Sequence, residues 1–175
     1  MRDCTVRSAR PEDAPAIAAI HVGTWQHAYR DLLPASLLDG LRVSDRLRMW
    51  EGMLAAPRPR TTTLVAKGND GPVGVCHAGP ERETDDPERA RTGEVFLIYV
   101  SPGEQGRGVG RALMDAACDA MRAHGFSEAV LWVLDGNTPA IAFYERMGWR
   151  ADGAVKQEML GAVPIEEVRY RRSLP

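Results

Sequence analysis

Three glycines at alternate positions, Gly106, Gly108 and Gly110, form a loop that could bind an anion. Glycine has no Cβ atom, so these positions tolerate positive φ and allow backbone N–H groups to approach a ligand closely. A helical pattern starts at Val109, and free N–H groups at the positive end of a helix suit a phosphate or pyrophosphate. The same spacing also fits an ordinary glycine-rich turn, and the glycines alone do not choose between the two.

Two other phosphate-binding loops do not match this stretch. A P-loop requires the pattern GxxxxGK[ST], and no lysine follows the glycines. The dinucleotide pattern GxGxxG is also absent, because Arg111 and Leu113 stand where its last glycine would be. The sequence therefore supports neither an ATP site nor a Rossmann site.

The elements around the loop follow from their apolar patterns. Residues 94–100 are almost continuously apolar, which predicts a strand buried in the middle of a sheet. Residues 109–124 carry apolar residues at helical spacing and end at Gly125. A second buried strand at 129–134 precedes a helix at 140–147. This strand–helix–strand–helix order predicts a parallel pair of strands.

The rest of the chain alternates between short helices and strands. We expect helices at 14–29, 34–39 and 45–55, the last capped by Ser44, and strands at 5–9, 61–67, 72–78, 153–159 and 164–172. Residues 80–92 are polar and mixed in charge, which indicates a loop beside the central strand.

Composition limits the class of protein. A chain of 175 residues suits one domain, residues 1–175, and a net charge of −2 gives no general attraction to nucleic acid or to anionic membranes. Its three cysteines show no metal or disulfide spacing, so we expect no metal site. No secretory signal pattern and no apolar run of about 20 residues is present, which favours a cytoplasmic protein.

Two stretches, YVSPGEQGRGVGRALM and LWVLDGNTPAIAFYERMGW, together resemble the Gcn5-related N-acetyltransferase (GNAT) superfamily. Gln105, Gly108 and Gly110 match its pyrophosphate motif, Gln/Arg-x-x-Gly-x-Gly/Ala, and Asn137 begins the second motif. Two motifs at the family's spacing favour this interpretation over a plain glycine turn. The resemblance implies an α/β GNAT fold: a mixed, mostly antiparallel sheet of six or seven strands with a splayed parallel pair, flanked by about four helices.

The resemblance also implies acetyl-CoA as the co-substrate, with its pyrophosphate on the amides of residues 106–111 and its pantetheine along the central strand. The pantetheine amides would pair with the exposed strand backbone as an added strand does. The implied cofactor-binding residues are Ile98, Tyr99, Val100, Gln105, Gly106, Arg107, Gly108, Val109, Gly110, Arg111 and Asn137.

The chemistry that the resemblance implies is direct attack of a neutral amine on the thioester while both substrates are bound. Tyr144 stands where family members keep a tyrosine that protonates the leaving thiolate. Glu94 stands where the histone-acetylating branch keeps a glutamate base. His77, or a water molecule, is the alternative base, and His77 also belongs with Trp25 and Tyr29 to the expected substrate-binding residues.

The acceptor is the least defined part of the prediction. Trp25 and Tyr29 are i,i+4 neighbours that form either core packing or one wall of an acceptor pocket. The expected activity is acetylation of a primary amine on a small molecule. A protein or peptide N-terminal acetyltransferase and a non-catalytic acyl-CoA-binding sensor are the alternatives. Dimers are common in the family, but no stretch of this sequence predicts one.

Overall fold

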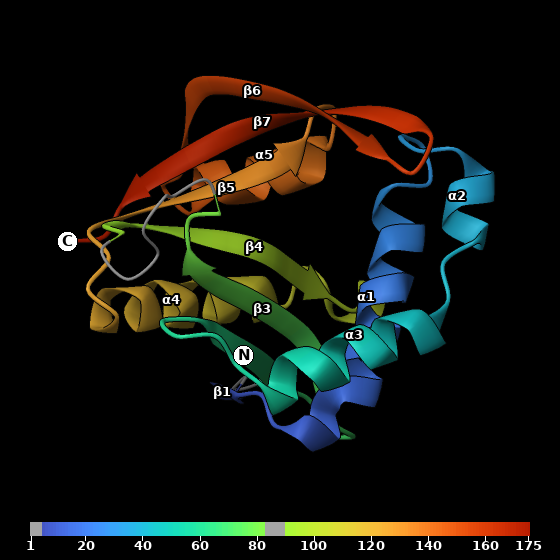
Figure 1. Ribbon diagram of the computed structural model, residues 1–175, viewed down its shortest axis with the longest axis horizontal. Coiled ribbons are helices and arrows are strands. Elements are labelled where there is room, and N and C mark those ends of the chain that lie inside the picture. Colours follow the sequence, from blue (N-terminus) through green and yellow to red (C-terminus); the bar gives the residue numbers. More distant parts are fainter. Residues whose placement is uncertain (1–4, 83–89) are drawn as a thin grey trace.

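The computed structural model describes residues 5–82 and 90–175, which form seven strands and five α-helices (Figure 1). The strands are β1 (Thr5–Ser8), β2 (Thr62–Lys67), β3 (Pro72–Pro80), β4 (Thr92–Val100), β5 (Glu128–Leu134), β6 (Arg150–Leu160) and β7 (Val163–Ser173). The α-helices are α1 (Ala14–Ala28), α2 (Ala35–Asp39), α3 (Val43–Ala55), α4 (Val109–Ala123) and α5 (Thr138–Arg146). Short 3-10 helices at Pro11–Asp13 and Pro102–Glu104 precede α1 and follow β4.

The strands form one sheet in the order β1-β2-β3-β4-β5-β7-β6. Among the described residues, β4 and β5 are the parallel neighbours, and the other adjacent strands run antiparallel. The helical connection α4 explains this arrangement, because parallel strands need a crossover between them. The predicted mixed sheet with a parallel pair is therefore confirmed.

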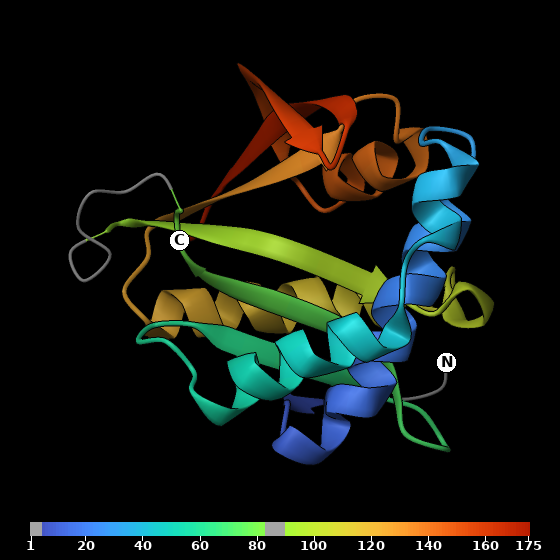
Figure 2. The same ribbon diagram turned by 45° about the vertical axis from the view of Figure 1, so that its right-hand side comes forward.

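Side chains on alternate strand positions divide the core into two layers. Leu64 and Cys76 face α4, whereas the neighbouring Val65 and Val75 pack with α1 and with Trp50 of α3. Figure 2 shows α4 on one side of β3 and β4, with α1 and α3 on the other. The central strands are covered on both faces, which agrees with their apolar sequences.

Some predicted boundaries were wrong. The helix expected to be capped by Ser44 begins at Val43, because the N–H groups of Asp45 and Arg46 both bond to the carbonyl of Arg42, which is the N-cap. β6 is longer than expected, since it keeps pairing with β7 across an irregularity between Ala151 and Val155. The polar segment predicted at 80–92 is flanked by longer strands, and its residues 83–89 lie outside the described residues.

In the part of the chain that the structure describes, no helix has the length and apolar character that crossing a membrane requires.

Candidate functional site

The parallel strands β4 and β5 pair at one end only. Their register joins residues 92–94 to residues 128–130 and goes no further. Beyond this point β4 stays beside β3 to Val100, and β5 stays beside β7 to Leu134, so the two strands diverge (Figure 2). Within the described residues, the side of β4 that faces β5 has no strand partner from Val95 to Val100. Its backbone is thus available to a ligand that binds as a strand does.

The glycine loop opens at the start of α4 and keeps its N–H groups accessible. Gly106 and Gly108 have φ of +74° and +86°, a region that favours glycine, and Gly108 is the N-cap of α4. A Cβ atom at either position would meet nothing within 4 Å, so the loop borders open space. The first N–H groups of an α-helix lack intrahelical acceptors. The loop thus has the conformation and the open surroundings that the predicted anion site needs, and anion binding there stays a prediction.

A cavity of about 730 Å³, here called the strand cavity, lies where β4 and β5 diverge. Its walls come from α1, β4, the glycine loop, β5, α5, β6 and β7. The predicted cofactor-binding residues that line it are Ile98, Tyr99, Val100, Gln105, Gly106, Gly108, Gly110, Arg111 and Asn137. The predicted loop and strand residues thus meet at one site.

Two of the predicted cofactor-binding residues do not line the strand cavity. The side chain of Val109, the first residue of α4, is buried in the core layer between α4 and the sheet. Arg107 forms an exposed ion pair with Glu104 at 3.2 Å. At these two positions the side chains do not contribute to the lining of the strand cavity.

Tyr144 lines the strand cavity from α5, opposite β4. Burial raises the pKa of its phenol well above the ordinary value, and the neighbouring Tyr29 adds to the rise. The phenol is therefore protonated at neutral pH, as a proton donor must be. The same shift makes it a weaker acid, so proton transfer to a thiolate depends on how the bound substrates change its surroundings.

Trp25 and Tyr29 both line the strand cavity and pack at the same time. The indole Nε1 of Trp25 donates to the Tyr99 hydroxyl at 2.8 Å, and the Trp25 and Tyr29 rings meet edge to face at 5.1 Å. Burial raises the pKa of Tyr29 to about 12, and the charge of Glu167 adds to this effect. The pair therefore packs together and lines the strand cavity at the same time, and its contact with an acceptor stays a prediction.

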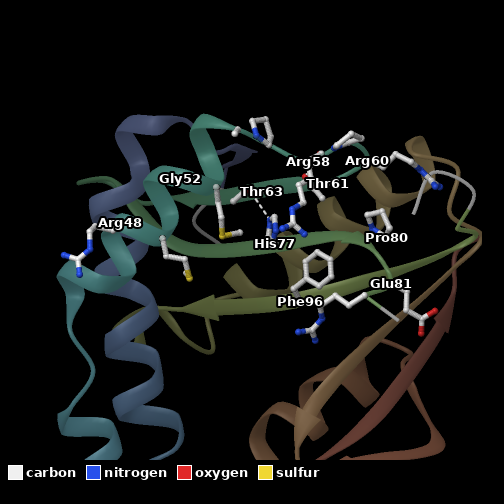
Figure 3. A pocket seen from close by; sticks show the side chains of 16 residues that line it. Arg48, Gly52, Arg58, Arg60, Thr61, Thr63, His77, Pro80, Glu81 and Phe96 are labelled. Carbon is white, nitrogen blue, oxygen red and sulfur yellow. Dashed lines mark hydrogen bonds between the residues drawn. The ribbon is translucent and has the colours of Figure 1, made fainter. Parts of the chain in front are cut away.

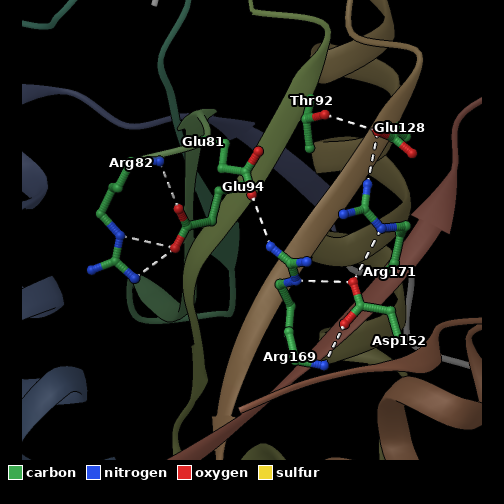
Figure 4. Close-up of polar contacts among 9 residues, drawn as sticks. Glu81, Arg82, Thr92, Glu94, Glu128, Asp152, Arg169 and Arg171 are labelled. Atoms are coloured by element: carbon green, nitrogen blue, oxygen red, sulfur yellow. Dashed lines mark hydrogen bonds and ion pairs between the residues drawn. The ribbon is translucent and has the colours of Figure 1, made fainter. Parts of the chain in front are cut away.

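Glu94 does not line the strand cavity. Its side chain is 1% exposed, and its carboxylate accepts the backbone N–H of Arg82 at 2.9 Å and the Arg82 Nε at 2.8 Å. The Arg82 guanidinium also forms an ion pair with it at 2.5 Å. Both oxygens accept bonds from Arg82 (Figure 4), so the carboxylate is held by this arginine.

His77 lines a second cavity of about 1230 Å³, here called the arginine cavity, on the α3 side of the sheet (Figure 3). Its Nδ1 lies 2.9 Å from the Thr63 hydroxyl, and its ring packs 5.2 Å from that of Phe96. Burial lowers the pKa of His77 to about 4, and the charge of Arg58 lowers it further. His77 is thus a weak base and does not line the strand cavity.

Four charged residues of the strand cavity were not predicted from the sequence: Arg82, Arg146, Glu158 and Glu167. Lys156 binds both glutamates, at 2.9 Å and 3.1 Å, and its hydrogen bond holds the pKa of Glu158 below the ordinary value. No motif marks these residues. The two glutamates reach the cavity because β7 pairs with β5 and β6 pairs with β7.

An ion-pair network joins the strands at the end where β4 and β5 are paired (Figure 4). Arg169 of β7 contacts Glu81 at 3.3 Å and Asp152 of β6 at 2.9 Å. Arg171 contacts Glu128 of β5 at 2.7 Å, and Glu128 accepts the Thr92 hydroxyl of β4 at 2.9 Å. This network lies at the end where β4 and β5 are paired, and the two strands separate toward the other end.

Comparison with known proteins gives a consistent picture. Residues 22–149 match the acetyltransferase (GNAT) family. The chain is 32% identical over 142 residues to the uncharacterized N-acetyltransferase YuaI of Bacillus subtilis, covering 81% of this chain and 77% of that protein. It is 28% identical over 174 residues to the probable N-acetyltransferase Rv2775 of Mycobacterium tuberculosis, covering 97% and 95%. The crystal structure of the PaiA N-acetyltransferase of Thermoplasma acidophilum with coenzyme A superposes with a TM-score of 0.77 at 14% identity, covering 98% of this chain and 99% of that one.

Proposed function

The chain belongs to the acetyltransferase (GNAT) family, and from this premise we propose that it transfers the acetyl group of acetyl-CoA to a primary amine of a small molecule. Membership confirms the predicted superfamily and the predicted enzyme class. The observation that carries the rest is that the glycine loop, the unpaired side of β4 and Tyr144 all open onto the strand cavity.

The residues present fit the pyrophosphate and pantetheine of acetyl-CoA. Gly106 and Gly108 are exposed and line the strand cavity at the start of α4, where the helix dipole favours an anion. Gln105 connects this loop to the end of β4, because its Nε2 donates to the carbonyl of Val100 at 3.2 Å. The unpaired edge of β4 between these two points offers backbone partners for the pantetheine amides.

Acetyl-CoA supplies a thioester that a neutral amine can attack directly. A backbone N–H of residues 98–100 stabilises the negative charge that develops on the thioester oxygen, because such a donor is already fixed by the pairing of β4 with β3. Tyr144 gives its proton to the sulfur as the thiolate leaves.

A base must receive the proton that the ammonium group of the acceptor loses before the amine attacks. Glu94 was predicted for this role, but its two oxygens are bound to Arg82 and it borders neither cavity. Glu167 is also paired with a cation, Lys156 at 3.1 Å, but unlike Glu94 it lines the strand cavity, and its charge acts on Tyr29 and Tyr99. We infer that the proton reaches Glu167 through water, and that Glu94 positions Arg82.

A small acceptor suits the strand cavity better than a polypeptide. Walls from α1, β6 and β7 border it in addition to the two central strands, whereas a peptide substrate needs an open groove. Trp25, Tyr29 and Trp132 supply apolar surface for the body of such an acceptor.

The test is a CoA-release assay with acetyl-CoA and a panel of small primary amines and short peptides. We expect at least one small amine to raise release above the rate of acetyl-CoA hydrolysis without an acceptor, with the acetylated product identified by mass spectrometry. Preference for peptides would favour the alternative N-terminal acetyltransferase. Tight acetyl-CoA binding with no stimulation by any acceptor would favour the non-catalytic sensor and contradict the proposal.

A further inference from the structure

The arginine cavity carries an excess of positive charge. Its lining includes four arginines and a single glutamate, together with a largely apolar floor of methionine, proline and phenylalanine side chains; the charged members are Arg48, Arg58, Arg60, Arg82 and Glu81. Glu81 is offset by Arg169 at 3.3 Å. An anionic group is thus the ligand chemistry that this lining favours.

Arg58 is the arginine of this lining that is most available to a ligand. Arg48 is paired with Asp45 at 2.6 Å, and Arg82 is paired with Glu94. Across the described residues, no ion pair or hydrogen bond joins the Arg58 guanidinium to another group, although its charge acts on His77. Figure 3 shows Arg58 extending over β2 and β3 on the side of the cavity where His77 lies.

His77 forms a neutral polar wall beside Arg58. Because its pKa is about 4, the ring is uncharged at neutral pH. The ring is held by the Thr63 hydroxyl, 2.9 Å from Nδ1, and by a hydrogen bond with the backbone of Thr62. Arg58 therefore supplies the free donors for an anion, and the neutral ring adds no second charge beside it.

The arginine cavity is continuous with the catalytic region through two shared residues. Phe96 and Arg82 line both cavities, and the Arg82 guanidinium lies 5.6 Å from the Phe96 ring. Phe96 is the extra residue of an irregularity in β4, since His77 pairs with Leu97 and Ala78 pairs with Val95. Such a bulge redirects a side chain, here to the boundary between the cavities.

We propose that the arginine cavity binds an anionic group, a carboxylate or a phosphonate, carried by the same small amine whose nitrogen is acetylated in the strand cavity. This inference rests on the proposed function and narrows its acceptor. The amine approaches Glu158 and Glu167, its apolar body passes Phe96, and its anion meets Arg58 beside His77. A polyamine would instead place a second cation against the arginines, which is unfavourable.

The experiment compares matched acceptors that differ only in the anion. The probes are ω-amino acids and ω-aminoalkylphosphonates whose chains are long enough to pass Phe96, together with the corresponding alkylamines. We expect kcat/KM to be at least about 10-fold higher for an anionic acceptor than for its alkylamine, since a hydrogen bond to a charged group has that magnitude. The carboxylate and phosphonate series identify which anion the cavity prefers.

Arg58→Gln tests the site within the protein. It should raise KM about 10-fold for the anionic acceptor, leave kcat nearly unchanged and leave the alkylamine unaffected. Arg42→Gln is the matched control, because Arg42 is an exposed arginine at the start of α3 that lines neither cavity. Equal turnover of acceptors with and without the anion, or equal effects of the two substitutions, would overturn the inference while the acetyltransferase proposal stands.

Measuring the binding of acetylated products tests the arginine cavity without enzyme turnover. Calorimetry on the protein with CoA compares N-acetyl amino acids with the matching N-acetyl alkylamines. If no amine supports CoA release, the proposed function fails, and the cavity is then judged by this measurement alone. Tighter binding of the anionic compound, lost in Arg58→Gln, supports the site, and equal binding contradicts it.

Discussion

Replacing Gly108 with aspartate tests where the pyrophosphate binds. Gly108 has φ of +86° at the N-cap of α4, and a Cβ atom there would meet nothing within 4 Å. Any other residue therefore adds conformational strain of about 1–2 kcal/mol but no steric clash with the protein. Aspartate also adds a negative charge at the point where we place a phosphate.

The two effects have different sizes and can be measured separately. At about 4 Å, two like charges repel by about 1 kcal/mol in water and about 4 kcal/mol near a protein surface, which corresponds to roughly 5- to 1000-fold weaker binding. Gly108→Ala carries the strain without the charge. Strain of this size lowers the Tm of a chain this long by roughly 2–8 °C. Aspartate is a favoured N-cap, so the aspartate variant should be no less stable than the alanine variant.

Calorimetric titration with acetyl-CoA and thermal melting without ligand are the measurements. Gly103→Ala is the control, because Gly103 lies near the same loop, does not have positive φ, and has open space around its Cβ position. We expect near-normal affinity for Gly103→Ala, a small loss for Gly108→Ala and a large loss for Gly108→Asp. If the aspartate variant binds acetyl-CoA as tightly as the alanine variant, the pyrophosphate does not bind at the start of α4.

Three further predictions concern chemistry and stability. Tyr144→Phe should lower kcat much more than acetyl-CoA affinity, because its proton matters only as the thiolate leaves; an unchanged kcat in steady-state assays would remove it from the mechanism. Glu167→Gln should lower kcat, whereas Glu94→Gln should mainly raise the acceptor KM by releasing Arg82, and the reverse pattern would restore Glu94 as the base. Asp13→Asn should reduce the free energy of unfolding by about 1–3 kcal/mol at pH 7, since the bond from Arg7 lowers the pKa of this buried carboxylate. That contribution is present above the unfolded pKa of about 3.9 and is lost as pH falls through the lower folded value, so the wild type and Asp13→Asn should converge in urea titrations at low pH.

The predicted elements were largely found because their signals are local. Apolar periodicity placed α4, and Gly125 ended it with φ of +83°. The near-continuous apolar run of β4 indicated a central strand, and β4 is the fourth of seven. The predicted start of α3 was wrong. The first N–H groups of this helix bond to the backbone carbonyl of Arg42, and no side chain caps it.

Charge pairing inside the site was not predictable in the same way. Glu94 has the position of a base along the chain, yet the tertiary structure buries it against Arg82, twelve residues earlier. His77 was predicted as an alternative base and as a substrate-binding residue, and the structure places it with Arg58 in a separate cavity. Neither pairing has a sequence period, because the partners come from different strands or loops.

By itself, the sequence determined the family, the order of the elements and the anion-binding loop, since glycine spacing and apolar periodicity depend on residues close together in the chain. The tertiary structure decided how far β4 and β5 stay paired, which carboxylates border the strand cavity, and that Phe96 and Arg82 connect it to a cavity lined by arginines. Those features depend on the long-range packing of β6, β7 and α3 around the central strands, and no local pattern encodes that packing.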